Sequence, residues 1–64
     1  MKTRHISSRA YTLNPNDKHL SVVLYINWKG EYVTHVYNSI DKGYHHGHYF
    51  GDDIAKATAD FLAR

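Results

Sequence analysis

Histidine is the residue type with the most chemistry to offer, since the chain has six histidines among 64 residues and no cysteine. His46 and His48 lie two residues apart in a stretch that reads as a strand, so both imidazoles would project from one face. Two such imidazoles suit one zinc ion, with His35 on the preceding strand or Asp41 in the turn as the candidate third ligand. Without cysteine or a defined fourth ligand, the pattern falls short of a zinc motif. We therefore predict neither a bound metal nor another cofactor, although histidine's titration near neutral pH makes a pH-sensitive surface an option.

The carboxylates and hydroxyls form no catalytic pattern. Helix capping explains Asp52-Asp53, and Ser7-Ser8 lacks the strand–turn–helix context of a nucleophile elbow. No glycine-rich phosphate loop exists. A chain this small also lacks the volume for an ordinary ligand pocket of roughly 300 Å³ or more. We predict a protein without enzymatic activity.

A hairpin over residues 20–38 has to position these side chains. Val22–Ile26 and Tyr32–Tyr37 are rich in β-branched and aromatic residues, which favours two strands. Between them, Asn27 suits the first position of a type I turn and Gly30 the left-handed position of a three-residue loop. A two-residue turn at Lys29-Gly30 is the alternative, and it would shift the strand register by one residue.

The three-residue loop pairs Asn27 with Glu31 and therefore sorts the hairpin residues onto two faces. One face carries Leu20, Val22, Leu24, Ile26, Tyr32, Thr34 and Val36. The other carries Ser21, Val23, Tyr25, Val33, His35 and Tyr37. Both faces are substantially apolar.

Two more strands are expected beside the hairpin. Residues 5–13 read as an edge strand whose Arg9 faces solvent, and the type I turn signal of Asn14–Asp17 joins this strand to the hairpin. A turn over residues 39–43, with Gly43 at positive φ, leads to a strand over residues 44–50. Gly47 within that strand indicates a bulge or a close backbone approach.

The last segment has the periodicity of an amphipathic helix over residues 52–64. Asp52 is the expected N-cap, and the apolar stripe consists of Ile54, Ala57, Thr58, Phe61 and Leu62. Predicted core residues are Val22, Leu24, Ile26, Val36, Ile54, Phe61 and Leu62.

These elements predict one small α+β domain spanning residues 1–64. Residues 1–4 form a flexible N-terminus, residues 5–50 an antiparallel sheet of three or four strands, and residues 52–64 a helix packed on one sheet face. The result is a βββ(β)α two-layer sandwich. A domain of this size buries only about 60% of its unfolded surface, so a partner or an oligomer would help to stabilise it.

One short helix covers one sheet face, which leaves the tyrosine-bearing face without cover. Exposed apolar patches mark interaction surfaces, and tyrosine is enriched in them. The contact residues that we predict are Tyr25, Val33, His35, Tyr37 and, at the turn tip, Trp28.

A nucleic-acid interface is the alternative for the same face. Leu24-Tyr25-Ile26, the Lys29-Gly30 turn, Gly47–Phe50 and the helix Ile54–Leu62 resemble the three-stranded DNA-binding domains of phage integrase arms and plant AP2 proteins. The resemblance implies docking of the sheet face on DNA. Those domains carry lysine and arginine along that face, whereas Leu20–Trp28 and Tyr32–Asn38 contain neither.

The function that we predict is a small non-enzymatic binding or inhibitory module. It acts by protein–protein contact through the tyrosine-rich face or an exposed edge strand, with a homodimer as the simplest form. Its size and composition resemble those of compact inhibitors encoded by phages and other mobile elements. No signal peptide or membrane-length apolar run is present, so we expect a soluble cytoplasmic protein without membrane partners.

Overall fold

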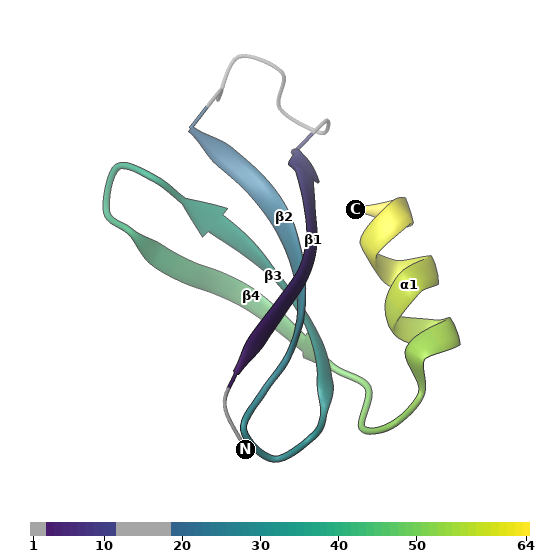
Figure 1. Cartoon of the computed structure of the whole chain (residues 1–64). Helices are drawn as coiled ribbons and strands as arrows, with labels where there is room; N and C mark the ends of the chain where they lie inside the picture. The colour runs from purple at the N-terminus through teal and green to yellow at the C-terminus, as the bar shows by residue number, and fades with distance from the viewer. Residues whose placement is uncertain (1–2, 12–18) are drawn as a thin grey trace.

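A computed structural model describes residues 3–11 and 19–64 of the chain. Four strands, β1 (Arg4–Ala10), β2 (Leu20–Ile26), β3 (Tyr32–Asn38) and β4 (Gly43–Tyr49), precede one helix, α1 (Ile54–Ala63). The strands form one antiparallel sheet in the order β1-β2-β3-β4, and α1 packs against β2 and β3 (Figure 1). The predicted α+β class, with its C-terminal helix on one sheet face, is confirmed.

The β2–β3 hairpin has the register of the three-residue loop. Ile26 pairs with Tyr32 and Val22 with Val36. The Asn27 side chain holds the loop, since its Oδ1 accepts hydrogen bonds from the backbone N–H groups of Lys29 and Glu31 at 3.0 and 2.9 Å. Gly30 has a φ of 83°, the left-handed conformation that this loop requires.

The other connections differ in part from expectation. In the β3–β4 turn, Lys42 and not Gly43 takes the positive φ, because Asp41 Oδ1 accepts from the N–H of Gly43 and ends the turn one residue earlier. Gly43 is thereby the first residue of β4. The predicted Asn14–Asp17 turn, residues 12–13 of the first predicted strand and residues 1–2 lie outside the described part of the chain.

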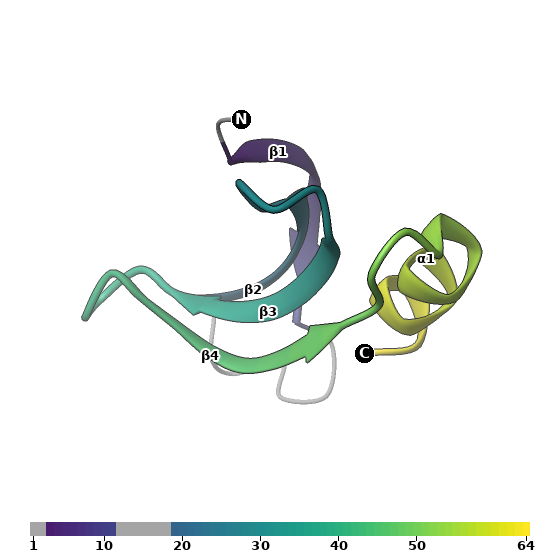
Figure 2. The same ribbon diagram turned by 90° about the horizontal axis from the view of Figure 1, so that it is seen from below.

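The sheet is strongly curved, and α1 lies on its convex side (Figure 2). The core between helix and sheet consists of Val22, Leu24, Ala57 and Phe61, with Tyr11, Tyr32 and Phe50 packed around it. Val36 is also buried, as predicted.

Two of the predicted core residues, Ile54 and Leu62, are exposed. With about 3.6 residues per turn, Leu62 lies about 100° around the helix from Phe61, beyond the narrow contact that a ten-residue helix makes with a curved sheet. Ile26 is only half-buried. The N-cap is Asp53, whose side chain accepts from the N–H of Lys56 at 3.0 Å, and not Asp52.

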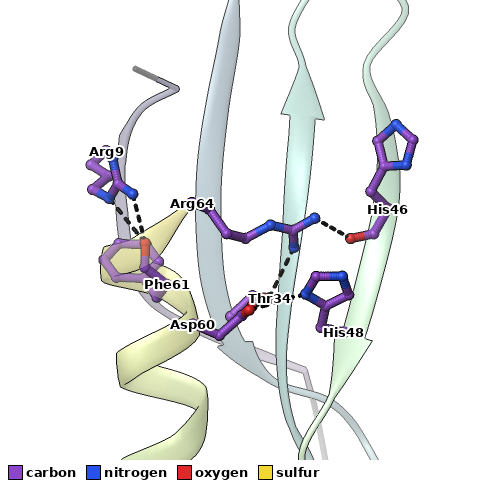
Figure 3. Close-up of polar contacts among 7 residues, drawn as sticks. All are labelled: Arg9, Thr34, His46, His48, Asp60, Phe61 and Arg64. Carbon is purple, nitrogen blue, oxygen red and sulfur yellow. Dashed lines mark hydrogen bonds and ion pairs between the residues drawn. The ribbon is translucent and has the colours of Figure 1, made fainter. Parts of the chain in front are cut away.

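Arg9 of β1 holds the C-terminal end of α1 and is not the solvent-facing residue predicted. Its Nε and Nη2 donate to the carbonyl of Phe61 at 3.0 and 2.8 Å (Figure 3). Nη2 also donates to the carbonyl of Leu62. The last carbonyls of a helix lack intrahelical partners and carry partial negative charge, so a guanidinium satisfies both needs. Arg9 therefore ties the edge strand to the helix.

No helix in the described part of the chain has the length and apolar character needed to cross a membrane.

Replacing Arg9 by Ala should lower the free energy of unfolding by about 1 to 2 kcal/mol, because the helix carbonyls lose a charged donor. Arg9→Lys should recover part of this loss, since lysine keeps the charge without the two-pronged geometry. Urea unfolding measures both values. Arg4→Ala on the same strand is the control, and an equal effect of the Arg4 and Arg9 substitutions would rule out the capping role.

Candidate binding face

Strand β4 contains an extra residue opposite His35. Thr34 pairs with His48 and Val36 pairs with His45, so both His46 and Gly47 lie opposite the single residue between Thr34 and Val36. This arrangement is a β-bulge, and His46 within it has a φ of 54°. The prediction that Gly47 marks a bulge or a close approach is confirmed on both counts.

The close approach at Gly47 is made by the imidazole of His35. A Cβ atom placed on Gly47 would lie 2.9 Å from both Cδ2 and Cε1 of that ring, and nearer still to Nε2. Real Cβ atoms essentially never come so close to a side chain. Only glycine at this position leaves room for the Nε2 edge of the His35 ring, and His35 is only 9% exposed.

His35 is the centre of an aromatic cluster on the concave face of the sheet. Its ring stacks on Tyr25 with an interplanar angle of 10°, and its Nδ1 shares a hydrogen bond of 2.9 Å with the Tyr25 hydroxyl. Tyr44 and Tyr49 meet His35 at steep angles, with ring centroids 5.8 and 5.9 Å away. Tyr37 packs on Tyr44 at 5.0 Å.

The bulge decides that Tyr44 and Tyr49 share this face. Side chains alternate along a strand, so residues five apart would ordinarily project to opposite sides. The extra residue shifts the alternation by one position, so Tyr44, paired with Tyr37, and Tyr49, paired with Val33, lie on the same face. Gly47 is the only sequence signal for this arrangement, and neither tyrosine is among the predicted contact residues.

A second bulge has the same effect in β1. His5 pairs with Tyr25 and Ser7 pairs with Leu24, so Ile6 is the extra residue. As a result His5 projects to the concave side while Arg9, four residues later, projects to the convex side and reaches α1. Both edge strands of the sheet are therefore bulged, and bulges increase the local twist of a sheet.

The concave face encloses a hollow of about 340 Å³. Four aromatic side chains line it, Tyr25, Trp28, Tyr44 and Tyr49, together with Thr3, His5, Val23 and Asn27. This volume corrects the expectation that so small a chain has no room for a ligand-sized pocket. The curl of the sheet provides the room, because β1 and the β2–β3 turn rise over one end of the concave face (Figure 2).

The predicted contact residues divide into a floor and a rim. Val33 is completely buried and His35 nearly so, so the concave face is not the uncovered surface that the strand pattern predicted. Tyr25 and Tyr37 are half-buried. Trp28 is 64% exposed at the rim, and the exposed fractions of Tyr44 and Tyr49 are 59% and 60%.

Burial affects the ionisation of both His35 and Tyr25. Burial lowers the pKa of His35 below its ordinary value of 6.5, and the nearby charge of Arg64 adds to the effect. Burial likewise raises the pKa of Tyr25 above 10.0, with contributions from Tyr49 and Tyr44. Both members of the hydrogen-bonded pair are therefore held in their neutral forms at neutral pH.

The candidate metal ligands His35, His46 and His48 do not come together. The bulge between them destroys the alternation that would have placed His46 and His48 on one face, and His35 lies on the concave side. In the close-up, the rings of His46 and His48 point apart (Figure 3). Within residues 3–11 and 19–64, no three His, Cys, Asp or Glu side chains form a group that could hold a metal ion.

His48 belongs instead to a polar network on the convex side. Asp60 of α1 accepts hydrogen bonds from the Thr34 hydroxyl at 2.6 Å and from His48 Nδ1 at 3.0 Å (Figure 3). Arg64 donates to the Thr34 hydroxyl at 3.0 Å and to the carbonyl of His46 at 2.6 Å. The Thr34 hydroxyl is buried and donates its proton to Asp60. Together, the contacts of Asp60 and Arg64 anchor α1 to β3 and β4.

Burial by itself would raise the pKa of Asp60, but the hydrogen bonds from Thr34 and His48 outweigh it and hold the pKa below the ordinary 3.8. A carboxyl group whose pKa is lowered by folding stabilises the folded state above its unfolded pKa. That contribution is lost as the pH falls through the folded value. Anchoring of the helix is thus complete at neutral pH.

No family model, curated protein or solved structure matches the chain. The geometry of the concave face therefore carries the functional interpretation.

Replacing Gly47 by Ala should cost about 1 to 3 kcal/mol of stability, because the new methyl group displaces the His35 ring. The cost should fall sharply when His35 is also replaced by Ala, which removes the clash. Chemical unfolding of the two single variants and the double variant measures this coupling.

Gly51→Ala is the matched control. Gly51 has a φ of 58° and open space around its Cβ position, so its replacement carries only a backbone cost that does not depend on His35. Equal costs for Gly47→Ala with and without His35 would show that the ring does not rest on Gly47.

Proposed function

We propose that this chain is a small non-enzymatic binding module that docks on another protein through its concave aromatic face. The observation that supports this function is the hollow of about 340 Å³ whose rim residues Trp28, Tyr44 and Tyr49 are all more than half exposed. The same face of the sheet also carries the buried residues Val33 and His35. Large aromatic rings held in place by a rigid floor lose little entropy on binding, which favours affinity.

The chemistry of the face favours a neutral or acidic apolar segment as its occupant. Strands β1 to β4 contain no carboxylate, and their two arginines project to the convex side. The nearest cation at the rim is Lys29, whose Nζ lies 5.2 Å from the centre of the Trp28 ring. A protruding aromatic, aliphatic or proline side chain fits between the rings, with a carboxylate beside it facing Lys29.

The edge strands are poorer docking sites than the concave face. Addition of a strand needs a regular row of free N–H and C=O groups, and bulges are a device that blocks such pairing. Both edges of this sheet are bulged, and on β4 Arg64 already occupies the carbonyl of His46. This comparison favours the face over the edge as the contact surface.

A second copy of the chain is a less suitable occupant than a different protein, because two concave faces do not fill one another. A homodimer remains a measurable outcome of the test below. A small rigid domain seated on a partner also blocks whatever else binds there, which would make the chain an inhibitor.

Single-stranded nucleic acid is the competing ligand, since bases stack on exposed tyrosine and tryptophan rings. Such binding also needs a basic track for the phosphates. Strands β2, β3 and β4 contain no lysine or arginine, and Arg9 of β1 is engaged by the helix. The charge distribution therefore favours a protein ligand.

The test is selection of binders from a displayed library of random peptides against the immobilised full chain. Binders should be enriched in apolar side chains next to acidic residues, and their binding should fall at least about tenfold with Tyr44→Ser/Tyr49→Ser, since buried aromatic anchors dominate interfaces. Circular dichroism checks that this variant stays folded. Tyr25 is left unchanged because its hydroxyl supports His35.

Leu62→Ser provides the matched control, because Leu62 is a large exposed apolar residue on α1. Binders that lose affinity with the control but not with the tyrosine variant would place the interface on the helix side. Binding of mixed-sequence single-stranded DNA or RNA at about 50 mM salt, released at about 500 mM, would favour the nucleic-acid function. Light scattering under the same conditions measures self-association.

A further inference from the structure

We infer that the concave face is pH-dependent: neutral His35 keeps the tyrosine cluster assembled, and protonation of His35 opens the cluster and releases the docked partner. The effect on the partner rests on the proposed function, whereas the opening of the face is a property of the free chain. The His35 ring of β3 packs on tyrosine side chains of both β2 and β4.

The His35 ring packs against side chains of β2 and β4 and against the backbone of Gly47. One ring face stacks on Tyr25 of β2, and Nδ1 shares a hydrogen bond with the Tyr25 hydroxyl. Tyr44 and Tyr49 of β4 meet the ring nearly edge-on, and Gly47 lies against its Nε2 side. A change in the charge or position of this ring is therefore felt by three of the four aromatic side chains that line the hollow.

The groups around His35 offer no compensation for a positive charge. From β4, His45 and His48 oppose protonation, and Arg64 next to α1 carries a full positive charge. From β1, His5 is the titratable group, lying opposite Tyr25. The carboxylates of the neighbouring elements are engaged elsewhere, since Asp41 pairs with His45 and Asp60 with His48.

Protonation also affects the hydrogen bond to Tyr25. A neutral imidazole has one acceptor nitrogen, whereas an imidazolium has two N–H donors and no acceptor. Where Nδ1 accepts from the Tyr25 hydroxyl, protonation reverses the bond: the hydroxyl oxygen becomes the acceptor, and its own proton needs another partner. Stacking on Tyr25 gives the cation some attraction, but the ring is nearly buried, and among the described residues no carboxylate pairs with it.

The direction of the pH dependence follows from the lowered pKa of His35. A group whose pKa is lower in the folded than in the unfolded state favours the fold in its neutral form. That contribution is complete above about pH 6.5 and is lost as the pH falls through the folded value.

The experiment is an NMR titration of the free full chain from about pH 7.5 to about pH 5, with assigned histidine and tyrosine ring signals. As His35 titrates, its nuclear Overhauser contacts with Tyr44 and Tyr49 should disappear. Peptides selected at about pH 7.5 should bind on the order of tenfold more weakly at about pH 5, since only the closed face binds.

His35→Phe keeps a ring on Gly47 but cannot titrate, so peptide binding by this variant should lose its pH dependence between these two values. His46→Gln replaces an exposed histidine of β4 that is not among the groups acting on His35, and it should retain the wild-type pH dependence. Ring contacts that persist after His35 is protonated would overturn the inference, as would an unchanged pH dependence in His35→Phe.

Failure of the docking function has a different signature. If Tyr44→Ser/Tyr49→Ser binds the peptides normally while the wild-type ring contacts still open with pH, the docking site is elsewhere and the pH response of the face stands. If the tyrosine variant loses binding but the contacts survive acidification, the docking function stands and the pH response does not.

Discussion

The contact between the His35 ring and the backbone of Gly47 is the constraint on which the concave face depends. A ring can lie there only because Gly47 has no side chain, and it lies opposite a bulge that supplies one extra residue in β4. The extra residue brings Tyr44 and Tyr49 to the same side of the sheet, where both pack on the ring that caused the arrangement. The tyrosines that β4 contributes to the hollow thus depend on a single local irregularity.

The same irregularities help to explain how so short a chain is stabilised without a disulfide. The convex face is covered by α1, which Arg9 holds from β1 and which Asp60 and Arg64 hold from its other side. The concave face is covered by its own tyrosines, which leaves Val23 and Val33 buried. Burial on both faces of one curved sheet takes the place of a second layer on the concave side.

Regular features of the fold could be predicted from the sequence, because they follow from local rules. Asn27 and Gly30 specify the loop between β2 and β3, and that loop sets the register of the hairpin. The apolar spacing around Phe61 likewise predicts the helix and its buried side. These features need no knowledge of distant contacts.

The bulges could not be predicted in the same way, because each depends on packing between strands. Gly47 is a signal for the bulge in β4, but its consequence for Tyr44 requires knowing that His35 lies opposite. The bulge at Ile6 has no glycine at all, and without knowledge of it the contact of Arg9 with α1 could not be foreseen. The errors over Arg9, His46 and the paired tyrosines have this common origin.

The most direct measurement is the set of nuclear Overhauser contacts of the His35 ring in the free chain at about pH 7.5, where the ring is neutral. We expect contacts from this ring to the Hα protons of Gly47 and to the rings of both Tyr44 and Tyr49. Contacts to one of these tyrosines but not the other, with no contact to Gly47, would mean that β4 runs without the bulge. The two tyrosines would then project to opposite sides of the sheet, and the concave face described here would not exist.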